Sequence, residues 1–346
     1  MMENVILKAA KKDKFVAEDF YSSTNYRTEI CHDGRWIQVQ NQRMDAMIVV
    51  QDGLAECKKL RDIKKGDLVV CGEEGVRTLN DSMKAKSEFE FMNNGVSSER
   101  RNELLIKKLA EDLGGRDKNV TVIVGPVVVH TGGDIYLREL IRKGYINSLL
   151  SGNAVAVHDI EKSYFGTSLG VCAKSGRVTE HGYKNHMRAI NRIMGYGSIE
   201  EAVNGDGLKS GIMYECVKHN VPFVLAGSLR DDGPLPDTVT DMIEAQTMYN
   251  EQLKDADIAI VLGSMLHGIA SGNMLPARTE MYCVDINPAV VTKLSDRGSS
   301  QAVGIVTDVG LFLNLLSREL ESVEMAGGGF RAKENASKEL ESSAIA

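Results

Sequence analysis

The stretch 261-VLGSMLHGIASGNML-275 places three glycines and a histidine directly after an apolar run. The glycine spacing departs from G-x-G-x-x-G, but Asp285 follows Gly263 by 22 residues and ends the next apolar run, MYCVD. Dinucleotide-binding units place an acid roughly 20 residues after the glycine loop, where it binds a ribose hydroxyl, and helix N-terminal amides face the pyrophosphate. The stretch therefore indicates a nucleotide site in which Asp285 favours NAD over NADP. The alternative is a tight strand-to-helix turn.

Three further polar clusters also follow apolar runs. Asn153 lies near the start of SGNAVAVHDIE, the pair Asp231 and Asp232 lies in AGSLRDDGPLPD, and Asp308 ends GIVTD. Ligands of open α/β sheets bind at the carboxyl ends of the strands, so the four clusters together predict one nucleotide site. Taken alone, the acid pair also fits a solvated loop.

Metal hydrolysis and ATP-dependent chemistry are not predicted, because the chain lacks H-E-x-x-H and G-x-x-x-x-G-K-[ST]. His158 and Asp159 are adjacent in sequence and cannot share one face of a helix as a ligand pair. A hydrogen-bonded polar network is the simpler interpretation of His158. We therefore expect no metal site.

Residues 1 to about 80 have the pattern of short strands. TEICHDGRWIQVQ alternates around Asp33-Gly34, and Asp52-Gly53 marks a second turn of the same kind. Asp-Gly between alternating segments is a hairpin signal. The sequence therefore predicts a β-rich N-terminal domain over residues 1–96.

Residues 97–118 switch to helical periodicity and predict a linking helix. Ser98 can cap it, and Gly114-Gly115 ends it. The expected apolar stripe comprises Leu104, Leu105, Ile106, Leu109 and Leu113.

Residues 119–322 alternate apolar runs with helical patterns, which predicts a Rossmann-like parallel sheet. NVTVIVGPVVVH predicts one strand buried on both faces, and TVTDMIEAQTMYNEQLKDA predicts one long helix. Residues 323–346 contain three consecutive glycines and few large apolar side chains, so a disordered tail is expected. The fold class is α/β, with a Rossmann-like NAD-binding domain after a smaller β-rich domain.

Composition narrows the function further. The net charge of −7 argues against nucleic-acid binding. No run approaches the roughly 18 apolar residues of a membrane span, and the charged N-terminus does not resemble a signal peptide. The six cysteines are scattered, which fits reduced thiols, and Cys71 and Cys283 are expected to be buried. We expect a cytoplasmic homo-oligomer that acts on a small molecule.

Several long strings resemble the archaeal-type ornithine cyclodeaminases, a family grouped with lysine-oxoglutarate reductase/saccharopine dehydrogenase. These strings include VSSERR, SGNAVAVHDIE, FGTSLGV, LRDDGPLPD, LGSMLHGIASGNMLP and CVDINPAVV. The resemblance covers about residues 17–320 and extends to the C-terminal half of cyanobacterial enzymes that join this activity to an arginine-degrading domain. Members of the family are expected to carry a further N-terminal segment that this chain does not have.

The resemblance implies tightly bound NAD and a lyase of arginine/ornithine metabolism and proline biosynthesis that converts L-ornithine to L-proline and ammonia. It also implies which positions bind NAD. They are Asn153, Ala154, Asp232, Ser264, Met265, Leu266, His267, Asp285, Asp308 and Val309. These positions fall on the four clusters that the strand-end argument selects.

The implied chemistry removes a hydride from the α-carbon, lets the δ-amine attack the resulting imine, releases ammonia and returns the hydride. Such a site needs an arginine for the substrate carboxylate and an acid/base for proton transfer. Our candidates are Arg43 or Arg100 for the carboxylate, and Asp231 or Glu99 for the δ-ammonium or proton transfer. They predict a cleft between the two domains.

Two other functions fit the same residues. Another NAD-dependent amino-acid dehydrogenase would release NADH, and a non-catalytic NAD-binding regulator would release no ammonia from ornithine. Measuring ammonia and proline with and without added NAD separates all three.

Overall fold

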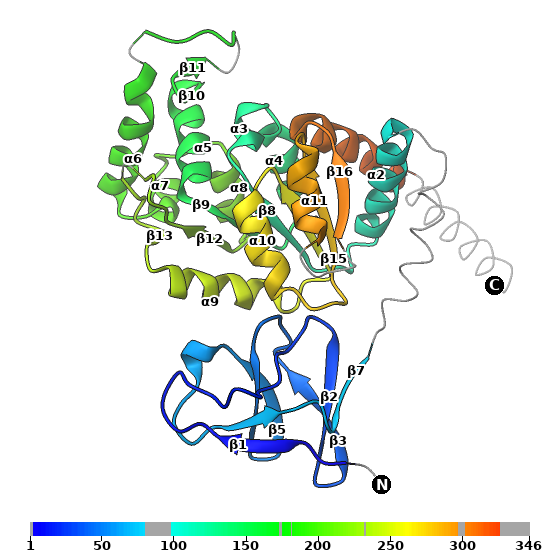
Figure 1. Cartoon of the computed structure of the whole chain (residues 1–346). Helices are drawn as coiled ribbons and strands as arrows, with labels where there is room; N and C mark the ends of the chain where they lie inside the picture. Colours follow the sequence, from blue (N-terminus) through cyan, green and yellow to red (C-terminus); the bar gives the residue numbers. More distant parts are fainter. Residues whose placement is uncertain are drawn as a thin grey trace, which may run out of the picture.

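The structure is a computed structural model of the whole chain, and it describes residues 3–79, 98–172, 175–180, 182–231, 233–296 and 302–325. The predicted tail beyond residue 325 and the acid Asp232 lie outside the described residues. Two sheets of seven strands each organise the described chain, one before residue 80 and one after residue 119 (Figure 1).

The first sheet has the strand order β1-β6-β4-β5-β3-β2-β7. Its strands are β1 (Ile6–Ala9), β2 (Arg27–His32), β3 (Arg35–Gln40), β4 (Met47–Gln51), β5 (Leu54–Lys58), β6 (Leu68–Cys71) and β7 (Val76–Leu79). Both predicted Asp-Gly turns are confirmed, because Asp33-Gly34 joins β2 to β3 and Asp52-Gly53 joins β4 to β5. All four turn residues have positive φ, as a two-residue hairpin turn of this kind requires.

The second sheet is parallel, with the order β13-β12-β9-β8-β14-β15-β16. Its strands are β8 (Val120–Val124), β9 (Ser148–Gly152), β12 (Phe223–Ala226), β13 (Thr238–Val239), β14 (Ile258–Leu262), β15 (Glu280–Asp285) and β16 (Ala302–Val306). Apart from the short β13, this is the Rossmann order 3-2-1-4-5-6. Successive strands are added on one side of β8 and then, from β14 onward, on the other side, so the strand order reverses between β8 and β14. The predicted fold class is confirmed.

Helices cover both faces of the parallel sheet (Figure 1). They are α2 (Ser98–Gly114), α3 (Val127–His130), α4 (Asp134–Arg142), α5 (Asn153–Phe165), α6 (Asn185–Tyr196), α7 (Ile199–Asn204), α8 (Ile212–Lys218), α9 (Met242–Leu253), α10 (Met265–Met274), α11 (Pro288–Asp296) and a helix over residues 309–325. Alternate strand residues face opposite layers. Val122 packs with α2 and α4, whereas its neighbour Ile123 packs with α9 and α10.

Three local predictions are wrong in ways that the structure explains. The run NVTVIVGPVVVH is not one strand: β8 ends before Gly125-Pro126, and residues 127–130 form the helical turn α3. Proline cannot donate to the sheet, so the ladder stops there. The helix predicted from Thr238 begins at Met242, because Oδ1 of Asp241 caps it by accepting from the backbone N–H of Ile243 at 2.7 Å.

The predicted stripe of α2 is also partly wrong. Leu105, Ile106, Leu109 and Leu113 are buried, but Leu104 is 43% exposed. At about 100° per residue, the four buried residues lie within one arc of roughly 100°, and Leu104 falls about 100° beyond the edge of that arc, on the solvent side of the helix. The predicted burial of Cys71 and Cys283 is confirmed, since both are fully buried free thiols.

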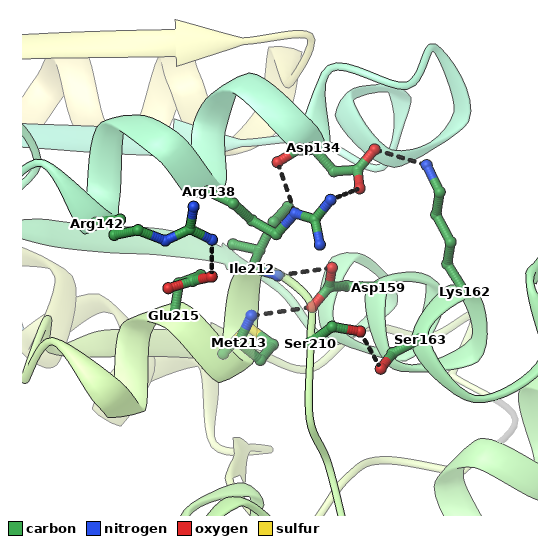
Figure 2. Close-up of polar contacts among 10 residues, drawn as sticks. All are labelled: Asp134, Arg138, Arg142, Asp159, Lys162, Ser163, Ser210, Ile212, Met213 and Glu215. Atoms are coloured by element: carbon green, nitrogen blue, oxygen red, sulfur yellow. Dashed lines mark hydrogen bonds and ion pairs between the residues drawn. The ribbon is translucent and has the colours of Figure 1, made fainter.

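A buried charged network holds α5, which carries Asn153, against α4 and α8 (Figure 2). The carboxylate of Asp159 on α5 accepts from the backbone N–H groups of Ile212 at 2.8 Å and Met213 at 2.9 Å, and thereby caps α8. A Cβ at Gly211 would lie 2.6 Å from Oδ2 of Asp159, so only glycine fits there without a shift. Beside this cap, Asp134 on α4 pairs with Lys162 on α5 at 2.6 Å.

Candidate functional site

Four adjacent strands of the parallel sheet finish in glycine at their carboxyl ends. Gly227 follows β12, Gly152 ends β9, Gly125 follows β8 and Gly263 follows β14. We call these four positions the glycine floor. It lies across the point where the strand order reverses, which is where open α/β sheets bind their ligands, and the missing side chains let neighbouring protein atoms pack close to the strand ends.

The two central glycines of the floor touch each other. The N–H of Gly125 donates to the carbonyl of Leu262 at 2.8 Å, and a Cβ at Gly125 would lie 2.0 Å from the carbonyl oxygen of Gly263. Gly263 itself has a φ of +59°, and a Cβ there would lie 2.1 Å from the side chain of Val127. The strand-to-helix turns after β8 and β14 are therefore close-packed, backbone against backbone.

Helix α10 begins directly after Gly263. Ser264 is its N-cap residue and makes no side-chain capping bond, so the first amides of the helix are not satisfied by that side chain. Met265 and Leu266 follow and are 41% and 73% exposed. A helix start of this kind suits the pyrophosphate of a dinucleotide, and exposed apolar side chains beside it can cover the ligand.

His267 lies in the first turn of α10, and its side chain lies beside Gly152 of the glycine floor. Its Nε2 lies 3.3 Å from where a Cβ on Gly152 would be. Its Nδ1 lies 2.8 Å from the hydroxyl of Tyr249 on α9. Burial lowers the pKa of His267 below the ordinary histidine value, which favours the neutral imidazole.

Asn153 organises the loop that carries the predicted acid pair. Its Oδ1 accepts from the backbone N–H of Leu235 at 3.1 Å and from the hydroxyl of Thr238 at 2.9 Å. The carboxylate of Asp231 accepts from the N–H of Ser228 at 2.8 Å and from its hydroxyl at 3.1 Å. Asp231 therefore shapes its own loop, and Ala154, next to Asn153, lies in the first turn of α5.

Asp285 and Asp308 lie at the ends of the next two strands. Oδ1 of Asp285 accepts from the N–H of Asn287 at 2.8 Å, and Oδ1 of Asp308 accepts from the N–H of Leu311 at 2.9 Å. Val309 is 2% exposed and would lie 3.4 Å from a Cβ on Gly263. The structure thus brings the described residues of the four predicted clusters to one edge of the sheet.

The N-terminal domain contacts the C-terminal end of α10. Nδ2 of Asn25 donates to the carbonyl of Leu275 at 2.6 Å, and the N–H of Met44 donates to the carbonyl of Asn273 at 3.2 Å. Asn273 is six residues beyond His267, about 9 Å along the helix axis. These contacts place the N-terminal domain beside the far end of α10 and α9.

Arg43 lies in this junction and is 8% exposed. Its Nε and Nη2 have no hydrogen-bond partner among the described residues. Burial, followed by the neighbouring Arg61, lowers the pKa of its guanidinium. Nearby, Oδ1 of Asn25 and Oε1 of Gln42 are also buried without a described partner.

Arg100 and Glu99 belong to the first turn of α2, at the opposite flank of the site. Nδ2 of Asn102 in the same turn donates to the carbonyl of Val306 at 3.0 Å, which places this turn at the carboxyl end of β16. Arg100 is exposed, and the side chain of Glu99 lies outside the described residues. The structure therefore separates the two candidate arginines, one beside α10 and one beside β16.

Sequence reasoning missed that two histidines, His130 and His158, lie side by side. Nδ1 of His130 lies 2.8 Å from the hydroxyl of Ser168, and the rings of His130 and His158 are 5.0 Å apart. Glu161, fully buried, accepts from the N–H groups of Leu169 and Gly170, each at 3.0 Å. Ser168 also lies in a G-x-S-x-G string, GTSLG, which could have drawn attention to it. The string follows a helix instead of a strand, so it is not a nucleophile elbow.

Two other features are absent from the described residues. No group of three or more His, Cys, Asp or Glu side chains there is arranged to hold a metal ion. Within the same ranges, no helix is both long and apolar enough to cross a membrane.

The fold and the residues at the carboxyl edge of the parallel sheet define a two-domain Rossmann protein with a dinucleotide-type site. The family described as arginine dihydrolase ArgZ-like, C-terminal, Rossmann fold, matches residues 105–316, and its first region matches residues 27–106. The chain belongs to this family.

Curated relatives carry two kinds of name. The ornithine cyclodeaminase of Methanocaldococcus jannaschii is 50% identical over 335 residues, which cover 93% of this chain and 79% of the relative. The bifunctional arginine dihydrolase/ornithine cyclodeaminase AgrE of Nostoc is 50% identical over 331 residues, which cover 92% of this chain and 47% of AgrE. The resemblance to the archaeal-type ornithine cyclodeaminases is confirmed.

Solved structures agree with these relatives. A conserved LOR/SDH protein from Methanococcus maripaludis superposes with a TM-score of 0.87 at 45% identity, covering 93% of this chain and 99% of that one. The ternary complex of AgrE with ornithine and NAD+ has a TM-score of 0.64 at 48% identity, covering 93% of this chain and 46% of AgrE.

Proposed function

We propose that the protein is an NAD-dependent ornithine cyclodeaminase that converts L-ornithine to L-proline and ammonia. The observation that carries the proposal is the glycine floor beneath the start of α10, at the point where the strand order reverses. Such a floor accepts a dinucleotide against the backbone. AgrE, a relative of this chain, has been solved with both ornithine and NAD+.

The proposed reaction needs no net oxidant. NAD bound at this site would supply the chemistry for removing a hydride from the α-carbon and for returning it later. Between these two transfers the δ-nitrogen forms a bond to the α-carbon, and the bond from the α-carbon to the α-nitrogen breaks. Ornithine with two ammonium groups therefore yields zwitterionic proline and one ammonium ion, so atoms and charge balance.

Two features of the site support its fit to NAD. The predicted contacts Ser264, Met265, Leu266 and His267 occupy the first turn of α10 and its cap. Asn153, Ala154, Asp285, Asp308 and Val309 lie at the ends of neighbouring strands, and Asp232 lies in the loop after β12. A carboxylate at Asp285 would repel the 2′-phosphate of NADP, which supports NAD as the cofactor.

The state of Arg43 supports a role in binding the substrate carboxylate. Nε and Nη2 are the two donors with which a guanidinium makes a side-on bidentate pair with a carboxylate, and both are buried without a described partner. Leaving such donors unsatisfied costs about 1–3 kcal/mol or more for a charged group. The unpartnered amide oxygens of Asn25 and Gln42 offer acceptors for an ammonium group in the same junction.

The remaining candidates are supported less evenly. Arg100 and Glu99 belong to the turn of α2 that the hydrogen bond from Asn102 to Val306 places at the carboxyl end of β16. Asp231 already accepts two hydrogen bonds from Ser228, so a role in proton transfer would require that loop to change partners. Homo-oligomer formation and a cytoplasmic location stay predictions.

The test is to incubate the purified protein with L-ornithine and to measure ammonia, proline and NADH, with and without added NAD. A cyclodeaminase forms ammonia and proline in equal amounts with no net NADH. Stoichiometric NADH would instead indicate an amino-acid dehydrogenase. NAD binding without ammonia release would indicate a regulator.

A further inference from the structure

Three elements of the Rossmann domain meet at the hydroxyl of Tyr249. The side chain comes from α9 and is 4% exposed. Its oxygen lies 2.8 Å from the carbonyl oxygen of Ser151 on β9 and 2.8 Å from Nδ1 of His267 on α10. Of the two side chains, only His267 is a predicted site residue; Tyr249 lies in the sequence of an ordinary core helix and had no predicted role.

The chemistry of these groups fixes where the hydrogens lie. A tyrosine hydroxyl has one hydrogen to donate, and a backbone carbonyl can only accept. Tyr249 therefore donates to Ser151, and its oxygen accepts from Nδ1 of His267. A neutral imidazole carries one hydrogen, so the Nε2 of His267 is left with a free lone pair.

The nitrogen that carries this lone pair lies beside Gly152, at the carboxyl end of β9. Nε2 is 3.3 Å, and Cε1 3.6 Å, from the position that a Cβ on Gly152 would take. Gly152 directly precedes Asn153, and it has no side chain to cover the nitrogen. An acceptor thus faces the glycine floor from above, where the resemblance places the cofactor.

We propose that Tyr249 is a positioning residue that holds His267 as the Nδ1–H tautomer, and that Nε2 of His267 takes and returns the protons of the substrate amines. The proposal rests on the proposed function. In it, the α-ammonium gives a proton to Nε2, so that the nitrogen lone pair can assist hydride loss from the α-carbon. The δ-ammonium loses one proton to water before its lone pair bonds to the α-carbon. Nε2–H then returns its proton to the departing nitrogen, accepts one from the new ring nitrogen, and gives that proton back to the ring nitrogen once the hydride has returned. The departing nitrogen leaves as ammonia and takes up the proton lost to water, so that one zwitterionic proline and one ammonium ion are formed.

The pairing can be tested without any turnover. In protein labelled with 15N-histidine, His267 is assigned by the loss of its signals in His267→Gln. We expect the wild type to show a protonated Nδ1 and an unprotonated Nε2, and Tyr249→Phe to lose that preference. The matched control is Tyr282→Phe, which removes a fully buried hydroxyl that donates to Glu280 at 3.1 Å and should leave the His267 signals unchanged.

Kinetics test the catalytic half of the proposal. General acid–base groups contribute about 10²- to 10⁴-fold, so His267→Gln should lower kcat for ornithine by a factor in that range. Tyr249→Phe should lower kcat at least about tenfold with KM changed less than about threefold, because proton transfer is affected more than binding. Tyr282→Phe should keep both constants.

Each result decides one part. An Nε2–H tautomer in the wild type overturns the pairing, and a wild-type kcat in Tyr249→Phe overturns the positioning role. A wild-type kcat in His267→Gln overturns proton transfer through Nε2. If the wild type binds NAD but releases no ammonia from ornithine, the proposed function fails and the proton-transfer role fails with it, while the 15N signals still decide the pairing.

Discussion

Replacing Asp159 by asparagine should change how the stability of the Rossmann domain depends on pH. Asp159 is 1% exposed, and burial, which outweighs its two backbone hydrogen bonds, raises its pKa from 3.8 to about 6. A carboxyl whose pKa is raised by folding favours the protonated form in the folded state. The folded protein therefore binds more protons than the unfolded chain between these two pKa values, and its stability falls as pH rises through about 6.

The magnitude follows from the same shift. At 1.36 kcal/mol per pKa unit, the ionised side chain costs on the order of 3 kcal/mol at neutral pH. Lowering the pH from 7 to 5 should recover about 1 kcal/mol of that cost in the wild type. Asp159→Asn cannot titrate, so this gain should be missing. Its amide oxygen can replace only part of the α8 cap, and the lost bond costs about 1–3 kcal/mol, which offsets most of the benefit of removing the charge at pH 7.

The assay is urea unfolding at pH 7, 6 and 5, followed by helical far-UV ellipticity. This signal reports on the Rossmann domain, because the α-helices of the described chain lie there and the single tryptophan, Trp36, lies in the N-terminal sheet. The control is Asp241→Asn. Asp241 is an exposed cap that accepts through one oxygen, which an asparagine can supply. If the wild type and Asp159→Asn gave parallel free energies of unfolding from pH 7 to 5, the assigned burial cost would be wrong.

Substitutions at three further positions test the site. Gly152 has a φ of −84°, which alanine also adopts, so Gly152→Ala should change the free energy of unfolding by no more than about 0.5 kcal/mol. Its Cβ would lie 3.3 Å from Nε2 of His267 and should lower kcat at least about tenfold. Unchanged kinetics would show that Nε2 does not face the ligand. Arg43→Lys replaces a fork by a point charge and should raise KM for ornithine about tenfold, with Arg43→Ala raising it further, and an unchanged KM would exclude the carboxylate role. Gly125→Ala puts a Cβ 2.0 Å from the carbonyl of Gly263, so it should destabilise the protein by about 1–3 kcal/mol and weaken NAD binding, as thermal unfolding and a fluorescence titration with NAD would show.

Local rules were enough to predict the hairpins and the strand ends. Asp33-Gly34 is a hairpin turn wherever alternating strands flank it, because both residues tolerate positive φ. Most of the parallel strands could be predicted in the same way, since they are short apolar runs followed by glycine or a polar residue, but Thr238–Val239 (β13) was assigned to the helix that follows it. Parallel strands carry their carboxyl ends to one edge, so the clusters around Asn153, Gly263 and Asp285 could be grouped before any coordinates were known.

What could not be predicted depends on contacts between distant segments. Tyr249 has the pattern of a core residue, and its bond to His267 exists only because α9 crosses beside α10. The three valines before His130 have the pattern of a strand, but Pro126 precedes them and ends the ladder, so they form a helical turn. The unpartnered Nε and Nη2 of Arg43 likewise depend on how the domains meet, which no spacing in the chain encodes.

Helix α9 contacts the N-terminal domain on one side and His267 of the Rossmann domain on the other. Gln246 on α9 accepts a hydrogen bond from Arg61 of the N-terminal domain, while Tyr249, one turn further, carries the bond to His267. A single rigid helix of 12 residues thus connects the domain that holds Arg43 to the imidazole over the glycine floor. A movement of the N-terminal domain against α9 would therefore reach the residue that hydrogen-bonds His267.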